Sequence, residues 1–290
     1  MEYGVTLPGT GPLATAEALT AVATRAEALG FASLWITDHV AIPLASGSRY
    51  PYNDDGRYPW TPAIPYLDAF TALTWVAAVT HRVRLGTSIL VLPMRPPLLV
   101  AKTVATLDHL TGGRMILAVG AGWLEEEFAL LGQPFDRRGR RTIEAIRVLR
   151  ACWSPDPVSF EGEFYRFAPF AMDPKPAQGP RLPVLGGGES DAALRRVAAV
   201  CDGWHPLGLT LDQVSDRLGR LRGYAEAAGR SFSEFLLTVR PGRAAPVTRD
   251  LGAQYGALGV RLLVADLNYR EMSLSESLAH LERLARELRL

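Results

Sequence analysis

Short apolar segments alternate along the chain with stretches whose apolar residues recur at helical spacing. Strands that alternate with helices in this way form right-handed βαβ units around a parallel sheet. About eight such units in 290 residues predict a closed (β/α)8 barrel, the TIM barrel, rather than an open sheet. The apolar segments that we predict as strands are 4–7, 33–36, 83–91, 115–119, 182–185, 203–205, 235–239 and 261–265.

Several of the predicted helices carry start and stop signals. Residues 15–30 are apolar along one face, and the stretch ends at a glycine. Residues 210–213 (TLDQ) and 273–276 (SLSE) have the spacing of a capping box. We therefore expect a helix to begin directly after each of these two signals.

Two segments interrupt the alternation. Residues 125–183 contain a helical stretch at 138–153 and a stretch at 158–167 that alternates like a small hairpin. We interpret this segment as an insertion after the fourth strand of a single domain, residues 1–290. Residues 41–65 form a long loop rich in Tyr, Pro and Trp, and loops of that length are usually lids or binding loops.

Composition narrows the range of partners and compartments. The formal net charge of +1 gives no reason to expect nucleic acid or a membrane surface as the main partner. No apolar run approaches the roughly 20 residues of a membrane helix, and the chain shows no signal peptide before its first strand. Two cysteines are too few for a disulfide framework, so we expect a protein of the reducing cytoplasm.

The predicted strand ends hold the candidate chemistry, because catalytic groups of such barrels lie at the carboxyl ends of the strands. These ends are rich in glycine and hydroxyl groups and poor in acids, which favours a bound planar or phosphorylated cofactor over a hydrolytic site. The segments are Pro8-Gly9-Thr10-Gly11, Thr37-Asp38-His39, Thr87-Ser88-Ile89, Gly120-Ala121-Gly122-Trp123, Gly186-Gly187-Gly188 and His205.

Two of these segments are glycine-rich. Residues 186–188 follow a strand and precede a predicted helix at 191–200, so their N–H groups can bind a phosphate; a flexible turn is the alternative. Residues 120–122 begin like a dinucleotide-binding fingerprint. Glu125 stands in place of its third glycine, which disfavours a Rossmann fold.

His39 is the best candidate for a general acid or base, since histidine titrates near neutral pH. Asp38 is better suited to orient a cofactor group, and a structural ion pair or cap is the alternative for both residues. The arginines within 137–141 are typical of a solvated helix face, although they could attract the anionic tail of a cofactor. No zinc-ligand spacing joins the five histidines, so we expect no catalytic metal: His39, His81, His109, His205 and His280.

Eight segments fall in order at the spacing of a known family: "GVTLP", "AEALGFASLWITDHV", "YPYNDDG", "LGTSILVLPMRPPLLVAKTVATLDHLTGGRMILAVGAGW", "RGRRTIEAIRVLR", "PVSFEGEFYRF", "PVLGGGES" and "CDGWHP". The chain resembles the bacterial luciferase-like monooxygenase superfamily, specifically its branch that uses the deazaflavin coenzyme F420. Beyond about residue 207 the resemblance is general. It implies a (β/α)8 barrel with an insertion after the fourth strand, a cytoplasmic homodimer, and hydride transfer.

The resemblance implies roles for matching residues. Asp38 and His39 fall on the acid–histidine pair beside the deazaflavin ring. Ser88 and Ile89 fall where the family often has a non-prolyl cis peptide, which would support the ring together with Thr87. The remaining matches are Gly120, Ala121 and Gly122 close to the cofactor, Gly186, Gly187 and Gly188 at its phosphate, and His205 in the lining of the same mouth.

Two positions depart from the sugar-phosphate dehydrogenase branch of that family. Pro43 stands where that branch has a tryptophan, and Trp123 stands where it has a glutamate. These departures weaken an assignment to glucose-6-phosphate oxidation and point to a more hydrophobic substrate. The resemblance thus implies a pocket formed by Trp123, Tyr50, Tyr52, Tyr58 and Trp60.

The predicted function is hydride transfer between coenzyme F420 and a small organic or natural-product substrate. Reduction of an activated C=C, C=N or C=O bond is favoured over alcohol oxidation. Two alternatives stay open. The first is an FMN-dependent monooxygenase that uses O2 and receives reduced flavin from a partner, and the second is a barrel that binds flavin or deazaflavin without catalysis.

Overall fold

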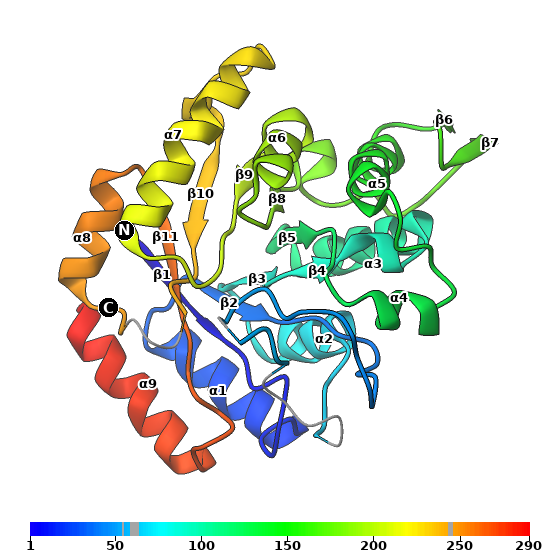
Figure 1. Ribbon diagram of the computed structural model, residues 1–290. Coiled ribbons are helices and arrows are strands. Elements are labelled where there is room, and N and C mark those ends of the chain that lie inside the picture. Colours follow the sequence, from blue (N-terminus) through cyan, green and yellow to red (C-terminus); the bar gives the residue numbers. More distant parts are fainter. Residues whose placement is uncertain (54, 59–63, 243–245) are drawn as a thin grey trace.

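The computed structural model describes residues 1–53, 55–58, 64–242 and 246–290. All eight apolar segments predicted as strands form strands, the third of them in two parts: β1 (Glu2–Thr6), β2 (Ser33–Ile36), β3 (Arg84–Thr87) with β4 (Leu90–Val91), β5 (Met115–Gly120), β8 (Val184–Gly186), β9 (Gly203–Trp204), β10 (Leu236–Val239) and β11 (Leu262–Ala265). They pair in parallel in the ring order β1-β2-β3-β5-β8-β9-β10-β11, and β11 returns to β1. The predicted TIM barrel is therefore confirmed (Figure 1).

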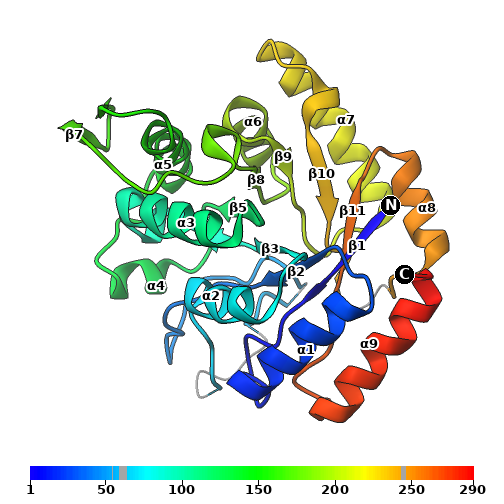
Figure 2. The same ribbon diagram turned by 180° about the vertical axis from the view of Figure 1, so that it is seen from behind.

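A helix follows each strand position of the ring and lies outside the barrel (Figures 1 and 2). Both predicted capping boxes, at 210–213 and 273–276, are present. Within the described ranges, no helix combines the length and apolar character that crossing a membrane requires. The ring helices are α1 (Ala16–Ala28), α2 (Ala69–Val79), α3 (Pro97–Thr111), α5 (Arg138–Trp153), α6 (Asp191–Val200), α7 (Leu211–Ala227), α8 (Arg249–Ala257) and α9 (Leu274–Leu288).

The segment 125–183 contains both a regular helix of the ring and added structure. Helix α5 packs between α3 and α6, so this part of the predicted insertion belongs to the barrel itself. Two additions flank α5: helix α4 (Glu125–Leu130) before it, and an antiparallel hairpin of β6 (Val158–Glu161) and β7 (Arg166–Phe170) after it. Short 3-10 turns lie at η1 (Leu92–Met94), η2 (Gly179–Arg181) and η3 (Phe232–Glu234).

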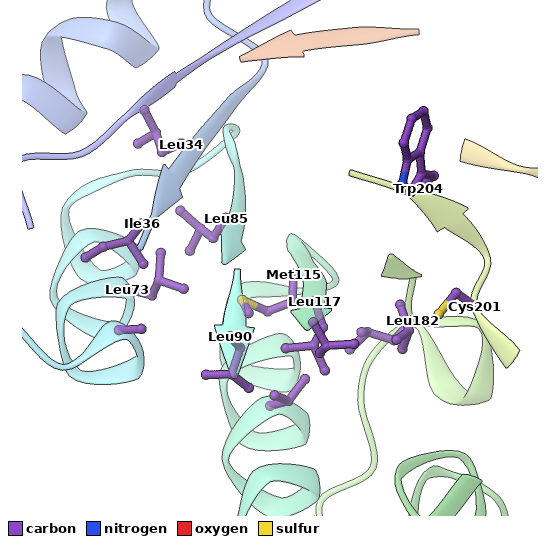
Figure 3. Close-up of a cluster of buried hydrophobic side chains, with 14 of the residues drawn as sticks. Leu34, Ile36, Leu73, Leu85, Leu90, Met115, Leu117, Leu182, Cys201 and Trp204 are labelled. Carbon is purple, nitrogen blue, oxygen red and sulfur yellow. The ribbon is translucent and has the colours of Figure 1, made fainter. Parts of the chain in front are cut away.

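The main hydrophobic core lies between the barrel and its helices. Side chains alternate along a strand, so Leu34 and Ile36 of β2 face outward while Trp35 faces the barrel interior. Figure 3 shows Leu34 and Ile36 with Leu85 of β3 and Leu73 of α2 in the same cluster. Each fully buried side chain of this kind contributes roughly 1.5–3 kcal/mol, so this layer holds the helices against the strands.

The barrel interior holds the fully buried indole of Trp35, which packs with Ile116, Ala118, Leu185, Leu262 and Val264. Each of the two neighbouring strands has a glycine beside this indole. A Cβ on Gly86 of β3 would lie 2.4 Å from Trp35 Cε3, and one on Gly4 of β1 would lie 3.0 Å from Trp35 Nε1. The indole N–H donates to Ser33 Oγ at 2.8 Å, so its polar atom is satisfied inside the barrel.

Replacing Gly203 with alanine is expected to destabilise the barrel by about 3 kcal/mol, because the added carbon overpacks the interface between two strands. In β9 that Cβ would lie 2.0 Å from the backbone oxygen of Leu236 in β10. Gly219→Ala in α7 is the matched control, since a Cβ there meets nothing within 4 Å. It should stabilise the protein by about 0.5–1 kcal/mol. Urea unfolding of both variants checks the difference, and equal midpoints would contradict it.

Candidate active site

Asp38 lies at the carboxyl end of β2 in a buried ion pair. Its Oδ1 accepts from Arg95 Nη2 at 2.6 Å, and its Oδ2 accepts from Arg95 Nη1 at 2.8 Å and from the Val91 N–H at 2.9 Å. Burial raises the pKa of Asp38, and Arg95 opposes that rise. A bidentate pair of this kind needs the carboxylate form. Both oxygens are therefore engaged by the protein, and the predicted contact of Asp38 with a cofactor stays a prediction.

His39 follows directly and is held by a carboxylate from α4. Its Nδ1 lies 2.7 Å from Glu127 Oε2, and the Glu127 side chain is only 1% exposed. The other oxygen, Oε1, accepts from the N–H groups of Val40 at 2.6 Å and Ala41 at 3.1 Å. Helix α4 thus fixes both the imidazole and the backbone that follows it.

Aromatic side chains surround the other sides of the His39 ring. The ring centroids of Tyr58, Tyr66 and Trp123 lie 5.6, 5.4 and 6.1 Å from that of His39, all in edge-to-face arrangements. The Tyr66 hydroxyl donates to Thr37 Oγ1 at 2.6 Å, which fixes its orientation. Sequence reasoning placed Tyr58 and Trp123 here but missed Tyr66.

The predicted substrate-pocket residues reach this site in part. Tyr50 contacts Trp123 at a centroid distance of 5.3 Å, so both belong with Tyr58 and Tyr66 to what we call the aromatic cluster. Tyr52 packs on Tyr50, also at 5.3 Å, but is 41% exposed at the outer edge. Trp60 lies outside the described residues.

The peptide bond between Ser88 and Ile89 is cis, which confirms the prediction. Ser88 is held from several sides. Its N–H donates to Ile36 O at 2.6 Å, its Oγ lies 2.9 Å from His205 Nε2, and its O and Oγ each accept from Arg240 Nη1 at 3.2 Å. Side chains that follow β9 and β10 thus fix the backbone between β3 and β4.

His205 and Thr87 lie inside the barrel, which for His205 differs from its predicted place in the lining of the mouth. His205 is fully buried, stacks on Trp35 at 4.5 Å, and has Nδ1 2.6 Å from Thr238 Oγ1. Burial lowers the pKa of His205 to about 3, so the ring is neutral. Thr87 Oγ1 bonds both backbone groups of Ala118. His205 and Thr87 therefore support the carboxyl ends of the strands from inside the barrel.

The Ile89 side chain lies between the glycine that ends β5 and the glycine that follows β8. A Cβ would lie 3.4 Å from Ile89 Cγ2 on Gly120 and 1.9 Å from Ile89 Cδ1 on Gly187. Gly186 differs, because a Cβ there would meet Val197 of α6 on the outer side of the strand. The structure thus brings together the predicted segments 87–89, 120–122 (with Ala121) and 186–188.

Two arginines lie beside this glycine rim, and we call them the arginine cradle. Arg138 Nε donates to Gly122 O at 3.0 Å. Arg196 is buried, with Nη1 3.5 Å from where a Cβ on Gly139 would lie and Nη2 3.9 Å from where one on Gly188 would lie. Burial lowers the pKa of Arg196, as does the neighbouring Arg138. In the described part of the chain, neither arginine forms an ion pair.

The other arginines of the stretch 137–141 are occupied. Arg137 and Arg140 both pair with Glu163. Arg141 donates to two backbone carbonyls of the turn before α5. Arg137 and Arg140 are exposed, so the interpretation of this stretch as a solvated helix face fits these two residues. Arg138 instead faces the glycine rim.

Four charged residues of the site were missed from the sequence: Glu127, Arg95, Arg240 and Arg196. Each acts across a long sequence separation, and only its place near a strand end or in the first turns of a helix could have pointed to it. Arg240 pairs with Asp266, where the two nearest atoms lie 2.6 Å apart. Among the residues that the structure describes, no three His, Cys, Asp or Glu side chains are grouped so that they could hold a metal ion.

Comparison with known sequences gives one family. Residues 1–249 match the family model of luciferase-like monooxygenases. An uncharacterized protein of Mycobacterium tuberculosis is 40% identical over 210 residues, which are 72% of this chain and 72% of that protein. The FMNH(2)-dependent dimethylsulfone monooxygenase of Pseudomonas putida is 36% identical over 157 residues, 53% of this chain and 43% of that protein.

Solved structures share the fold. Monooxygenase RslO1 from Streptomyces bottropensis has a TM-score of 0.78 at 22% identity, over 99% of this chain and 98% of that one. An F420-dependent secondary alcohol dehydrogenase, in complex with an F420–acetone adduct, has a TM-score of 0.69 at 21% identity, over 99% and 84%. The likeness to these structures concerns the fold, and the family match carries the assignment: the chain belongs to the luciferase-like monooxygenase family.

Proposed function

We propose that this luciferase-like oxidoreductase uses the deazaflavin coenzyme F420 and exchanges a hydride with a small organic or natural-product substrate. Reduction of an activated double bond is the favoured direction. The proposal rests on one arrangement, in which His39 is held by a buried carboxylate and faces an aromatic cluster at the carboxyl end of the barrel. When bound, the deazaflavin would supply the hydride carrier.

His39 would exchange the proton that accompanies hydride transfer, since it is the titratable side chain at the centre of the aromatic cluster. Burial raises the pKa of Tyr58 and of Tyr66, so both phenols are neutral at physiological pH. With Trp123 they form aromatic walls around the imidazole. Such walls suit a substrate with an apolar body and strengthen the electrostatic effect of His39 on a reacting group.

The arginine cradle would hold the anionic part of the cofactor. Arg138 and Arg196 are neighbouring cations that form no ion pair with the described residues, and the burial of Arg196 makes an unpaired charge costly. The glycines at 186–188 lead into α6, whose first N–H groups add to the positive potential. The residues present therefore fit a phosphate group.

Replacing Arg196 or Arg138 with methionine is expected to weaken cofactor binding about 10- to 100-fold, because each loses a hydrogen bond between charged groups. Fluorescence titration of the purified variants measures this change. Arg140→Met is the matched control, because Arg140 is exposed and pairs with Glu163. A loss of the same size in Arg140→Met would remove the cradle from the proposal.

The second candidate function is an FMN-dependent monooxygenase. The relative in Pseudomonas putida favours it, because that protein is FMNH(2)-dependent and is 36% identical over about half of this chain. Both cofactors carry phosphate, so the arginine cradle serves either. The two candidates differ in the ring that the aromatic cluster and the Ser88–Ile89 segment would face.

Separate titrations with F420 and with FMN distinguish the two candidates. The proposal expects F420 to bind and its absorbance to change when reduced F420 meets a substrate from a panel of enones, imines and ketones. Secondary alcohols with oxidised F420 test the reverse direction. Tight FMN binding with no F420 binding would overturn the proposal in favour of the monooxygenase.

A further inference from the structure

Glu127 divides its two carboxylate oxygens between two tasks. Oε1 accepts from the backbone N–H groups of Val40 and Ala41, while Oε2 lies 2.7 Å from His39 Nδ1. The side chain is 1% exposed, so water does not compete for either oxygen. The carboxylate therefore has a fixed orientation with respect to the imidazole.

A carboxylate only accepts hydrogen bonds, so the proton of this contact belongs to Nδ1 of His39. We propose that Glu127 is a positioning residue, which holds His39 in the Nδ1–H tautomer and leaves Nε2 as the atom that exchanges protons with a bound substrate. In alcohol oxidation the O–H bond would break, its proton would go to Nε2, and the carbon would give its hydride to the cofactor. Reduction reverses each of these transfers.

The other groups around the ring do not compete for this role. Tyr58 and Tyr66 contact His39 edge-on and are neutral, and Trp123 has no acceptor. Asp38 is engaged by Arg95. In the described part of the chain, the hydrogen bond to Glu127 is the only one made by the His39 ring.

The glutamine variant gives a sharp test because the two oxygens of Glu127 are not equivalent. In Glu127→Gln the single amide oxygen should stay with the two backbone N–H groups, which need an acceptor. The NH2 group then faces Nδ1 and donates to it, which forces the proton of a neutral imidazole onto Nε2. The substitution should therefore reverse the tautomer without changing the shape of the side chain.

Glu126→Gln is the matched control. Glu126 is the neighbouring residue of α4, and its Oε1 also accepts two backbone N–H groups, from Gly47 at 2.6 Å and Ser48 at 3.1 Å. Among the residues that the structure describes, no hydrogen bond joins it to His39. Its substitution should disturb the loop to a comparable extent and leave the imidazole as it is.

Nitrogen-15 NMR of histidine-labelled protein reads the tautomer without cofactor or substrate. At a pH where the ring is neutral, we expect Nδ1 to be protonated in the wild type and in Glu126→Gln, and Nε2 to be protonated in Glu127→Gln. His39→Gln identifies the signals. A wild-type ring protonated on Nε2, or an unchanged pattern in Glu127→Gln, would overturn the inference, and the wild-type spectrum decides even if the variant does not fold.

The effect on turnover rests on the proposed function and is measured separately. Glu127→Gln should lower kcat about 10- to 100-fold with little change in KM, as for other residues that orient a catalytic group. A tautomer that reverses while turnover is unchanged would contradict the role of His39 in catalysis, yet leave its tautomer assigned to Glu127. An unreversed tautomer would refute the positioning role whatever the reaction proves to be.

Discussion

Replacing His39 with alanine is expected to lower kcat by on the order of 10²–10⁴-fold, the usual contribution of general acid–base catalysis. The imidazole lies at the end of β2 among Tyr58, Tyr66 and Trp123, and none of these neighbours titrates near neutral pH. Without it, the proton that would accompany the proposed hydride transfer would lose its donor or acceptor. Steady-state kinetics with the substrate found by screening measures the loss.

Cofactor affinity should change little in the same variant, because the arginine cradle lies at the ends of β5 and β8 rather than at β2. His81→Ala is the matched control, since His81 is exposed between α2 and the amino end of β3, away from the carboxyl ends of the strands. Unchanged turnover in His39→Ala would remove this residue from the mechanism. Loss of turnover together with loss of cofactor binding would assign His39 to cofactor binding rather than to proton transfer.

The second large effect is on stability. Arg95→Met is expected to lower the free energy of unfolding by about 3–5 kcal/mol, because it leaves the Asp38 carboxylate buried without its partner. The Asp38 side chain is 0% exposed and that of Arg95 is 15% exposed. Val91 would then supply the one remaining hydrogen bond seen in the structure. Urea unfolding, followed by circular dichroism, measures the change.

Two comparisons interpret that result. Arg25→Met breaks the pair with Glu282 between α1 and α9, whose side chains are 45% and 36% exposed, and should cost at most about 1 kcal/mol. The double variant Asp38→Asn/Arg95→Met should recover part of the loss, since no unpaired charge is left. If Arg95→Met proved no worse than Arg25→Met, the buried pair would not be a major contributor to stability.

Hydrophobic alternation made the barrel predictable. Each of the eight apolar segments forms a strand, because a strand of a closed barrel is buried on both faces and reads as a continuous apolar run. Helix α5 was harder to place. Its neighbours α4 and the β6–β7 hairpin interrupt the spacing, so the sequence alone did not separate a helix of the ring from the additions beside it.

The site was predictable only where it follows the strand ends. That rule placed His39 at the carboxyl end of β2, but it did not identify the carboxylate that holds it. Glu127 is 88 residues away, in a run of three glutamates that is typical of a solvated helix start. Each residue of a helix is rotated about 100° from the one before it, so three consecutive glutamates face three different environments. Only Glu127 is turned inward.

His205 shows a related limit. The strand-end rule placed it at the rim, yet side-chain alternation turns Trp204 outward and His205 into the barrel. There it stacks on Trp35 and contacts Ser88 from below. A position at the end of a strand therefore does not by itself bring a side chain to the mouth of the barrel, because neighbouring residues such as Ser88 can cover it.

The Trp35 indole and the glycine beside it on β3 have an evolutionary consequence. The indole of Trp35 in β2 occupies the space that a side chain on Gly86 of β3 would need, since a Cβ there would lie 2.4 Å from Trp35 Cε3. A relative that gains a side chain at Gly86 should also carry a smaller residue at the position of Trp35. Substitution at these two positions is therefore expected to be correlated, and a lineage that changes only one of them should pass through an unstable intermediate.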